Sequence, residues 1–202
     1  MTDEHEHQHD HDHSEHEHHH HEPVDYGDAI RSYRANKDDA FRNAHDSPVP
    51  VAEREAFVGL PYFDVRPELR FEGLTLEPYA GNEPTSFQIP TTDGKLRPAE
   101  RAGTFRFEVD GVACSLTGYA FAGGDSDSVF VPFLDGTTGK ESYGAGRYLD
   151  LYAEEDGTYA LDFNLAYHPS CVYDPRFSCP LTPAENRLAV RIEAGERLAL
   201  EG

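Results

Sequence analysis

The chain has 202 residues, with 38 acidic side chains against 17 basic ones and a formal net charge of −21. Hydrophobic residues make up 38% of it, which suits one modest domain with a buried core. No run of about 18 apolar residues occurs, and no basic and then apolar segment opens the chain, so we expect neither a membrane span nor export. The negative charge argues against nucleic acid and anionic membrane surfaces as partners, because both would be repelled. A cytoplasmic protein is therefore expected.

Residues 1–22 form a low-complexity tail of histidines and acids that we expect to be disordered. Many of the histidines alternate with other residues, so neighbouring imidazoles of an extended chain fall on one side and could share a Zn²⁺ or Ni²⁺ ion. This predicts weak chelation at several sites, with a solvated polar tail as the equally weighted alternative, and no other cofactor is predicted. The candidate metal ligands are His5, His7, His9, His11, His13, His16, His18, His19, His20 and His21.

The body of the chain, residues 23–202, is acidic as well. The tail holds eight of the acids, which leaves 30 acids against 17 bases in the body, and 14 of those bases are arginines. Such a bias is typical of proteins that work in concentrated salt, where self-repulsion is screened. We expect a halophilic protein, and an ordinary acidic protein is the alternative.

The first expected element is an amphipathic helix within residues 24–45. Apolar side chains recur at helical spacing between Tyr26 and Phe41, and prolines follow the segment. A shorter helical turn is expected to begin at Val51 and to end before Pro61. The longer helix should cover one side of the body.

After residue 69 the apolar pattern changes to alternation, which is typical of β-strands. Residues 104–116 carry Asp110-Gly111 at their centre, a dipeptide typical of a two-residue type I′ hairpin turn. A second hairpin is expected over 147–166, with a three-residue loop that ends at a left-handed Gly157. These hairpins predict a mainly β fold, an antiparallel sandwich or open barrel with an N-terminal helix, whose further strands lie near 70–77, 85–90, 128–134 and 188–193.

The register of the second hairpin places Asp150 directly opposite Asp162 on the face away from its buried leucines. Like charges in that position repel, and a cation, an arginine or a shared proton would relieve them. Two coupled carboxylates suit acid–base catalysis or a hard metal ion, whereas a solvated acidic face is the favoured alternative. The candidate catalytic residues are Asp150, Asp162, Arg147 and Tyr143, although Arg147 could instead pair internally with Asp162 or Glu185.

Residues 162–186 are rich in proline and in aromatic and polar side chains, which predicts a long loop. Long loops with little regular structure are often functional. Cys171 and Cys179 within this loop are expected to form a disulfide or a close pair, with a zinc site or a cysteine nucleophile less favoured. The candidate ligand-binding residues of the loop are Asn164, Tyr167, His168, Arg176, Glu185 and Asn186.

Four stretches carry a resemblance to a known family: FVGLPYFDV (57–65), VPFLDGTTGKESYGAGRYLDL (131–151), LDFNLAYHPSCVYDPRFSCPLTPAENRLAV (161–190) and IEAGERL (192–198). They resemble the bacterial and archaeal family named domain of unknown function 1684. The resemblance implies one module over residues 23–202 without an assigned activity, and the histidine-rich tail lies outside the family pattern. That pattern more often has asparagine at position 168, which weakens a metal role for His168.

Three functions stay open at this point. A noncatalytic module that binds a small ligand or a metal ion at a rim built from 131–151 and 162–186 is slightly favoured. A hydrolase that uses the carboxylate pair is the second, and a metal buffer that acts through the tail is the third. The sequence predicts neither the identity of a ligand nor the oligomeric state.

Overall fold

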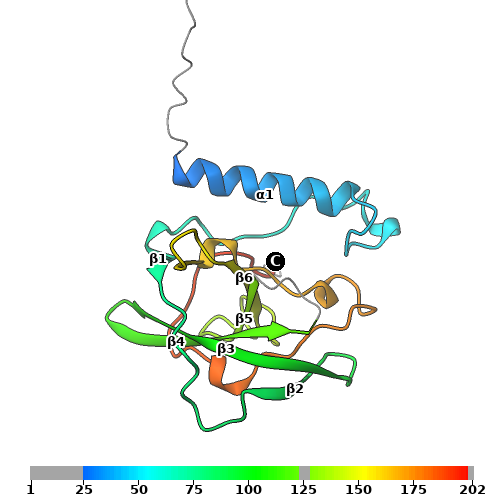
Figure 1. The fold of residues 1–202 in the computed structure, drawn as a ribbon. Helices are drawn as coiled ribbons and strands as arrows, with labels where there is room; N and C mark the ends of the chain where they lie inside the picture. The colour runs from blue at the N-terminus through cyan, green and yellow to red at the C-terminus, as the bar shows by residue number, and fades with distance from the viewer. Residues whose placement is uncertain (1–24, 123–127, 200–202) are drawn as a thin grey trace, which may run out of the picture.

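The structure of the protein is a computed structural model that describes residues 25–122 and 128–199. The histidine-rich tail and the metal ligands expected there lie outside the described residues. The helix α1 (Tyr26–Asn43) lies across a body made mainly of strands (Figure 1). The strands are β1 (Arg70–Leu74), β2 (Ser86–Pro90), β3 (Leu96–Val109), β4 (Val112–Phe121), β5 (Ser128–Phe133), β6 (Arg147–Tyr152) and β7 (Tyr159–Asp162). Short 3-10 turns occur at η1 (Val51–Glu53), η2 (Pro67–Leu69), η3 (Phe163–Leu165), η4 (Ser170–Val172) and η5 (Ala184–Asn186).

The helix α1 falls inside the expected segment, and its first turn is capped by a side chain. The carboxylate of Asp25 accepts a hydrogen bond from the backbone N–H of Asp28 at 3.2 Å, which satisfies one of the unpaired donors of a helix start. Ile30 is buried against the body. The turn expected at Val51 is present as η1, and Leu60 after it is buried.

The strands form a five-stranded antiparallel sheet in the order β2-β3-β4-β5-β6 and a separate pair, β1-β7. The Asp110-Gly111 hairpin is confirmed: both residues have positive φ, 50° and 79°, and Val109 pairs with Val112 across the turn. The mainly β fold with an N-terminal helix is also confirmed, and its sheets are open rather than closed into a barrel. Over the described residues, no helix has the length and apolar composition needed to cross a membrane.

The turn of the second hairpin forms as expected. Gly157 has a φ of 81°, and Ala153 bridges Tyr159 in antiparallel fashion, which is the register that the sequence favours. Beyond this bridge the two strands separate, because β6 pairs with β5 whereas β7 pairs with β1.

The expected direct opposition of Asp150 and Asp162 is therefore wrong. Asp150 lies opposite a residue of β5, and Asp162 lies opposite a residue of β1. The turn η3 follows β7 directly and returns the chain to β6. There Tyr167, and not a residue of β7, forms an antiparallel bridge with Tyr148 of β6. The structure also buries Asp162, which argues against the solvated acidic face that was the favoured alternative.

The strand expected near 188–193 is wrong as well. Its apolar alternation reflects burial, since Leu188 and Ile192 lie in the core. Part of its backbone bonds to the chain just after β5, where Leu188 N donates to Leu134 O and Val190 O accepts from Gly136 N, both at 2.8 Å. The next turn bonds to side chains: Ile192 N donates to Asp135 Oδ2 at 2.7 Å, and Ile192 O accepts from Arg147 at 2.7 Å. This mixture of partners forms no continuous strand ladder.

One core joins the two sheets to the C-terminal segment. Its members are apolar side chains from η2, the strands, η3 with the residue after it, and the last 15 or so described residues, so the segment after β7 belongs to the same core as the strands. They are Leu69, Phe105, Val109, Leu116, Val129, Val131, Phe133, Leu149, Leu151, Leu161, Phe163, Ala166, Leu188, Ile192 and Ala194.

Candidate functional site

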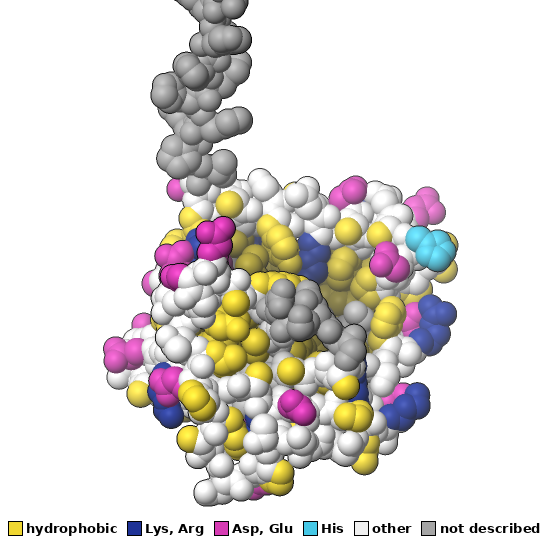
Figure 2. All heavy atoms as spheres, in the orientation of Figure 1, with side chains coloured by type: hydrophobic (Ala, Val, Ile, Leu, Met, Phe, Trp, Pro, Cys, Tyr) yellow, Lys and Arg dark blue, Asp and Glu magenta, His cyan; other side chains and the backbone are white. Residues whose placement is uncertain are grey.

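Two pockets meet at Asp150 and Tyr167, which line both of them. The face in Figure 2 shows hydrophobic side chains gathered below the helix. The first pocket, of about 420 Å³, has the size of a small-molecule site. We call it the tyrosine pocket, and it is lined by Tyr33, Leu149, Asp150, Leu151, Tyr152, Glu154, Ala160, Asp162, Leu165 and Tyr167. The second, of about 290 Å³, is the aromatic pocket, lined by Arg97, Phe121, Ser128, Phe130, Tyr148, Asp150, Tyr167, Pro169, Ser170, Cys179 and Pro180.

A short hydrogen bond joins the two shared residues. The hydroxyl of Tyr167 donates to Asp150 Oδ2 at 2.5 Å. Burial of the phenol, together with the neighbouring carboxylate of Asp150, raises the pKa of Tyr167 far above its ordinary value. Tyr167 therefore stays protonated and keeps donating, which holds the Asp150 carboxylate in place between the two pockets.

Asp162 is satisfied on the other side of the tyrosine pocket. Its Oδ2 accepts from the Tyr26 hydroxyl of α1 at 2.7 Å, and its Oδ1 accepts from the backbone N–H of Asn164 at 2.9 Å. Burial, with Asp162 as the next cause, raises the pKa of Tyr26 above its ordinary value. The Asn164 side chain bonds both the backbone N–H and the C=O of Arg66, at 2.7 and 2.8 Å. Asn164 thus connects η3 to the chain before β1, and its side-chain amide also donates to Asp162 Oδ1 at 3.1 Å.

Four aromatic rings run in sequence beside the aromatic pocket. They are Phe121, Phe130, Tyr148 and Tyr167, with successive centroid separations of 5.4, 4.7 and 5.8 Å. A cation stands over each end of the series: the Arg97 guanidinium lies 4.3 Å from the Phe121 centroid, and Lys37 Nζ lies 4.8 Å from that of Tyr167. Both contacts are within the range of cation–π attraction.

Lys37 also ties α1 to the C-terminal segment. Its Nζ lies 2.7 Å from Glu196 Oε1, and both side chains are largely buried. Glu196 Oε2 accepts from the Tyr173 hydroxyl at 3.0 Å and from the backbone N–H of His168 at 2.7 Å. One buried carboxylate therefore joins the helix, the 162–186 loop and the end of the domain.

His168 is held inside this cluster as a neutral imidazole. Its Nε2 accepts from the backbone N–H of Tyr143 at 3.2 Å. Burial lowers the pKa of His168 to about 3, and the nearby cations of Arg147 and Lys37 act in the same direction. The acceptor nitrogen is already occupied, so His168 is a structural residue in this arrangement.

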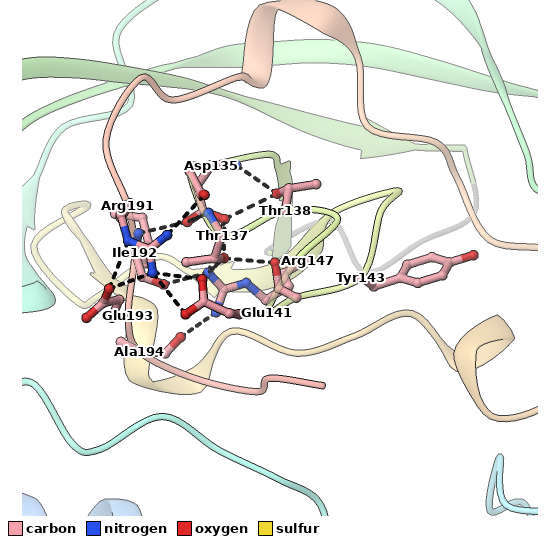
Figure 3. A network of polar contacts seen from close by, with 12 residues as sticks. Asp135, Thr137, Thr138, Glu141, Tyr143, Arg147, Arg191, Ile192, Glu193 and Ala194 are labelled. Carbon is pink, nitrogen blue, oxygen red and sulfur yellow. Dashed lines mark hydrogen bonds and ion pairs between the residues drawn. The ribbon is translucent and has the colours of Figure 1, made fainter. Parts of the chain in front are cut away.

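Arg147 lies in a separate buried network (Figure 3). Its guanidinium pairs with Asp135 Oδ1 at 3.3 Å and donates to the carbonyls of Ile192, Ala194 and Glu196 at 2.7, 2.5 and 3.1 Å. Arg147 does form an internal ion pair, but the partners expected for it, Asp162 and Glu185, are wrong. Its partner is Asp135, which lies two residues after the end of β5. Tyr143 points away from this network (Figure 3).

Comparison with known proteins identifies the family. The family described as "Protein of unknown function (DUF1684)" matches residues 55–197. The chain belongs to this family. A similar solved structure is the solution NMR structure of an uncharacterised protein from Haloarcula marismortui, which is 39% identical, covers 87% of this chain and 95% of that chain, and has a TM-score of 0.64. No protein with a curated description matches.

The DUF1684 match includes most of the pocket but not the helix. Asp150, Asp162 and Tyr167 lie inside the matched range, whereas Tyr33 and Lys37 belong to α1, which precedes it. The tyrosine pocket is therefore completed by a segment outside the DUF1684 match.

Three other candidates lie in the DUF1684 range but line neither pocket. Glu185 pairs with Arg101 at 2.8 Å and accepts from the Tyr119 hydroxyl at 3.0 Å. The Asn186 side chain bonds the backbones of β4 and β5. Arg176 is exposed and pairs with the nearby Asp174.

Of the predicted residues, the structure thus brings Asp150, Asp162 and Tyr167 together in the tyrosine pocket. Asn164 does not line this pocket but bonds Asp162. Tyr33 and Glu154 were not predicted as lining residues, and neither were Lys37 and three of the four aromatic rings, those of Phe121, Phe130 and Tyr148. The spacing of Tyr33 and Lys37, four residues apart on one helix face, was the available signal.

The described residues of this DUF1684 protein contain no group of three or more His, Cys, Asp or Glu side chains arranged to hold a metal ion. Cys114, Cys171 and Cys179 are free thiols, and the backbone N–H of Cys171 donates to Cys179 Sγ at 3.4 Å. Of the two expectations for this pair, the structure has the close pair.

Proposed function

We propose that the protein is a noncatalytic module that binds a small organic cation in the tyrosine pocket. The observation that carries this proposal is the lining of that pocket: three tyrosines and three carboxylates, with no lysine or arginine among the lining residues. Carboxylates are frequent throughout this chain, so their presence in one pocket is weak evidence for a ligand. The three tyrosines are the stronger evidence. Aromatic rings beside carboxylates attract an ammonium group, most strongly where water is partly excluded.

The polar groups of the pocket favour binding over catalysis. Asp150 and Asp162 each accept a hydrogen bond from a tyrosine hydroxyl, and no imidazole or thiol lines the pocket. The alternative, a hydrolase, would use these carboxylates together with Arg147 and Tyr143, neither of which lines it. A bare metal ion is also less favoured, since a hard cation takes six or more oxygen ligands and two of the three carboxylates already bond tyrosines.

Calorimetric titration tests the proposal with choline and with its neutral isostere 3,3-dimethylbutan-1-ol, at one fixed salt concentration. We expect choline to bind about ten-fold tighter or more, because cation–π and carboxylate contacts act on the charged compound alone. Asp150→Asn should weaken choline binding. Glu108→Gln is the matched control, because Glu108 is an exposed carboxylate on β3 that does not line the pocket. Equal affinity for the two compounds, or equal losses in the two variants, would contradict the proposal.

A second function is chelation of Zn²⁺ or Ni²⁺ by the tail. It is favoured by the ten histidines of residues 1–22, which lie outside the described residues. The acid excess and the use of 14 arginines against three lysines support a further proposal, that the protein works in concentrated salt.

A further inference from the structure

Cys171 and Cys179 lie close together beside the aromatic pocket, which Cys179 lines. The turn η4 carries Cys171, whose backbone N–H donates to Cys179 Sγ at 3.4 Å. Cys179 is anchored to the turn after β2: Thr92 N donates to Cys179 O at 2.9 Å, and Cys179 N donates to Thr92 Oγ1 at 3.1 Å. Two cysteines eight residues apart in the loop are therefore held close together by hydrogen bonds of their backbone.

The two thiols differ in access. Cys171 is half-buried, whereas Cys179 is buried and lines the aromatic pocket beside Pro180. Burial raises the pKa of Cys179 to about 11, so Cys171 is the thiol that a soluble oxidant meets first. The third thiol, Cys114, lies on β4 opposite Phe107 in the β3–β4 hairpin and is part of no such pair.

We propose that Cys171 and Cys179 are a reversible dithiol–disulfide pair that responds to small disulfide oxidants. In the first step, the Cys171 thiolate attacks a sulfur of glutathione disulfide and releases one glutathione thiolate. In the second, Cys179 loses its proton, its sulfur attacks Cys171 Sγ in the mixed disulfide, and the second glutathione thiolate leaves. The pair loses two protons and two electrons, and one glutathione disulfide becomes two glutathione molecules.

The bond would close the loop that contains Tyr173, whose hydroxyl donates to the buried Glu196. It would also fix Cys179 and Ser170, which both line the aromatic pocket. Oxidation should therefore stabilise the domain by restricting the unfolded chain, and it should stiffen this wall of the pocket. The inference does not depend on the proposed cation site.

The experiment uses the full chain, reduced first and then equilibrated in buffers of graded glutathione to glutathione-disulfide ratio. Samples are quenched with acid, alkylated with N-ethylmaleimide and weighed intact. Reduced protein should take three adducts, and oxidised protein should take one, which peptide mapping assigns to Cys114. Returning the sample to reduced glutathione should restore all three.

Single variants supply the controls. Cys114→Ser should still lose both remaining thiols on oxidation and gain thermal stability, whereas Cys171→Ser and Cys179→Ser should show no such gain. Three adducts after oxidation, a glutathione adduct on Cys171 that Cys179 does not displace, or disulfide-linked dimers would each overturn the proposal. A Cys171–Cys179 bond that reduced glutathione fails to open would overturn its reversibility.

Discussion

Replacement of Arg147 by methionine is a direct test of the buried network around the C-terminal segment. The Arg147 side chain has 0% exposure, and its partners are the Asp135 carboxylate and the carbonyls of Ile192, Ala194 and Glu196. Methionine fills a similar volume but donates no hydrogen bond. The variant therefore leaves a buried carboxylate without its counter-charge and three carbonyls without their donor.

The size of the effect follows from burial. Removing one partner of a buried ion pair costs about 3–5 kcal/mol, because the remaining charge is left without compensation. Asp135 keeps hydrogen bonds from Thr137 and from the backbone N–H of Ile192, which lowers the loss, whereas the unpaired carbonyls raise it. We expect the free energy of unfolding to fall by about 3–5 kcal/mol, a large part of the ~5–15 kcal/mol that stabilises a typical domain.

Arg191→Met is the matched control in the same region (Figure 3). Arg191 lies 2.7 Å from both Glu141 and Glu193, closer than the 3.3 Å between Arg147 and Asp135, but its side chain is 45% exposed. Distance alone would rank the Arg191 pairs as the stronger ones. Burial reverses that order, since exposed ion pairs contribute little, and we expect Arg191→Met to unfold close to the wild-type midpoint.

Urea unfolding followed by circular dichroism at one salt concentration measures both variants, together with Asp135→Asn and the double variant Arg147→Met/Asp135→Asn. The double variant should lose less stability than the two single losses added together, because no unpaired charge remains in it. Equal losses for Arg147→Met and Arg191→Met, or strictly additive losses in the double variant, would refute the argument from burial.

Three further predictions are tested by simpler measurements. The thermal midpoint should rise from low salt into the molar range, where the screening length shrinks from about 10 Å at 0.1 M to about 3 Å at 1 M, and a midpoint indifferent to salt would contradict the halophilic expectation. A chain that starts at residue 24 should lose nearly all Zn²⁺ or Ni²⁺ uptake in calorimetry while it stays folded, and full retention of stoichiometry would contradict chelation by the tail. His168 has a pKa of about 3 against an ordinary 6.5, so the unfolded chain takes up the proton first and stability falls as the pH drops from about 6.5 toward 3. His168→Asn should therefore lose less stability between pH 7 and pH 5 than the wild type in urea unfolding, and an equal loss would show that His168 does not titrate in this way.

Elements that depend on neighbouring residues were predictable from the sequence. The helix α1 falls within the expected 24–45, and the Asp110-Gly111 hairpin has the expected register, because capping, helical spacing and turn chemistry act over a few residues. The turn at Gly157 follows the same rule.

The partners of strands were not predictable in this way. The β6–β7 hairpin begins in the expected register, but β7 pairs with β1, which lies about 90 residues earlier in the chain, and nothing in the local pattern encodes that choice. The segment 188–193 shows the same limit. Its apolar alternation correctly predicts that Leu188 and Ile192 are buried, but the strand pairing that it also predicts does not form. Its partners are the backbone just after β5 and the charged side chains of Asp135 and Arg147, rather than a strand.

The candidate site contains both residues that the sequence predicted and residues that it did not. Asp150 and Asp162 do line one pocket, although not as the cross-strand pair from which their proximity was inferred. Tyr33 and Lys37 were not predicted as its neighbours, because helical spacing defines the apolar face of α1 but not the place where that face lies on the body.

That place is set by polar contacts of α1 with the DUF1684 part of the chain, and three of them lie close to Tyr33 in the helix. The Tyr26 hydroxyl bonds Asp162, the Arg34 guanidinium bonds the carbonyl of Phe63 at 2.9 Å, and Lys37 pairs with Glu196. Each contact joins a polar side chain of the helix to a polar group of the body, so the helix cannot slide along the body without breaking them. Since Tyr33 lies between Tyr26 and Lys37 on the same helix, these contacts also fix its position in the pocket. The residues that hold the helix in place therefore determine the shape of the tyrosine pocket, even though most of them do not line it.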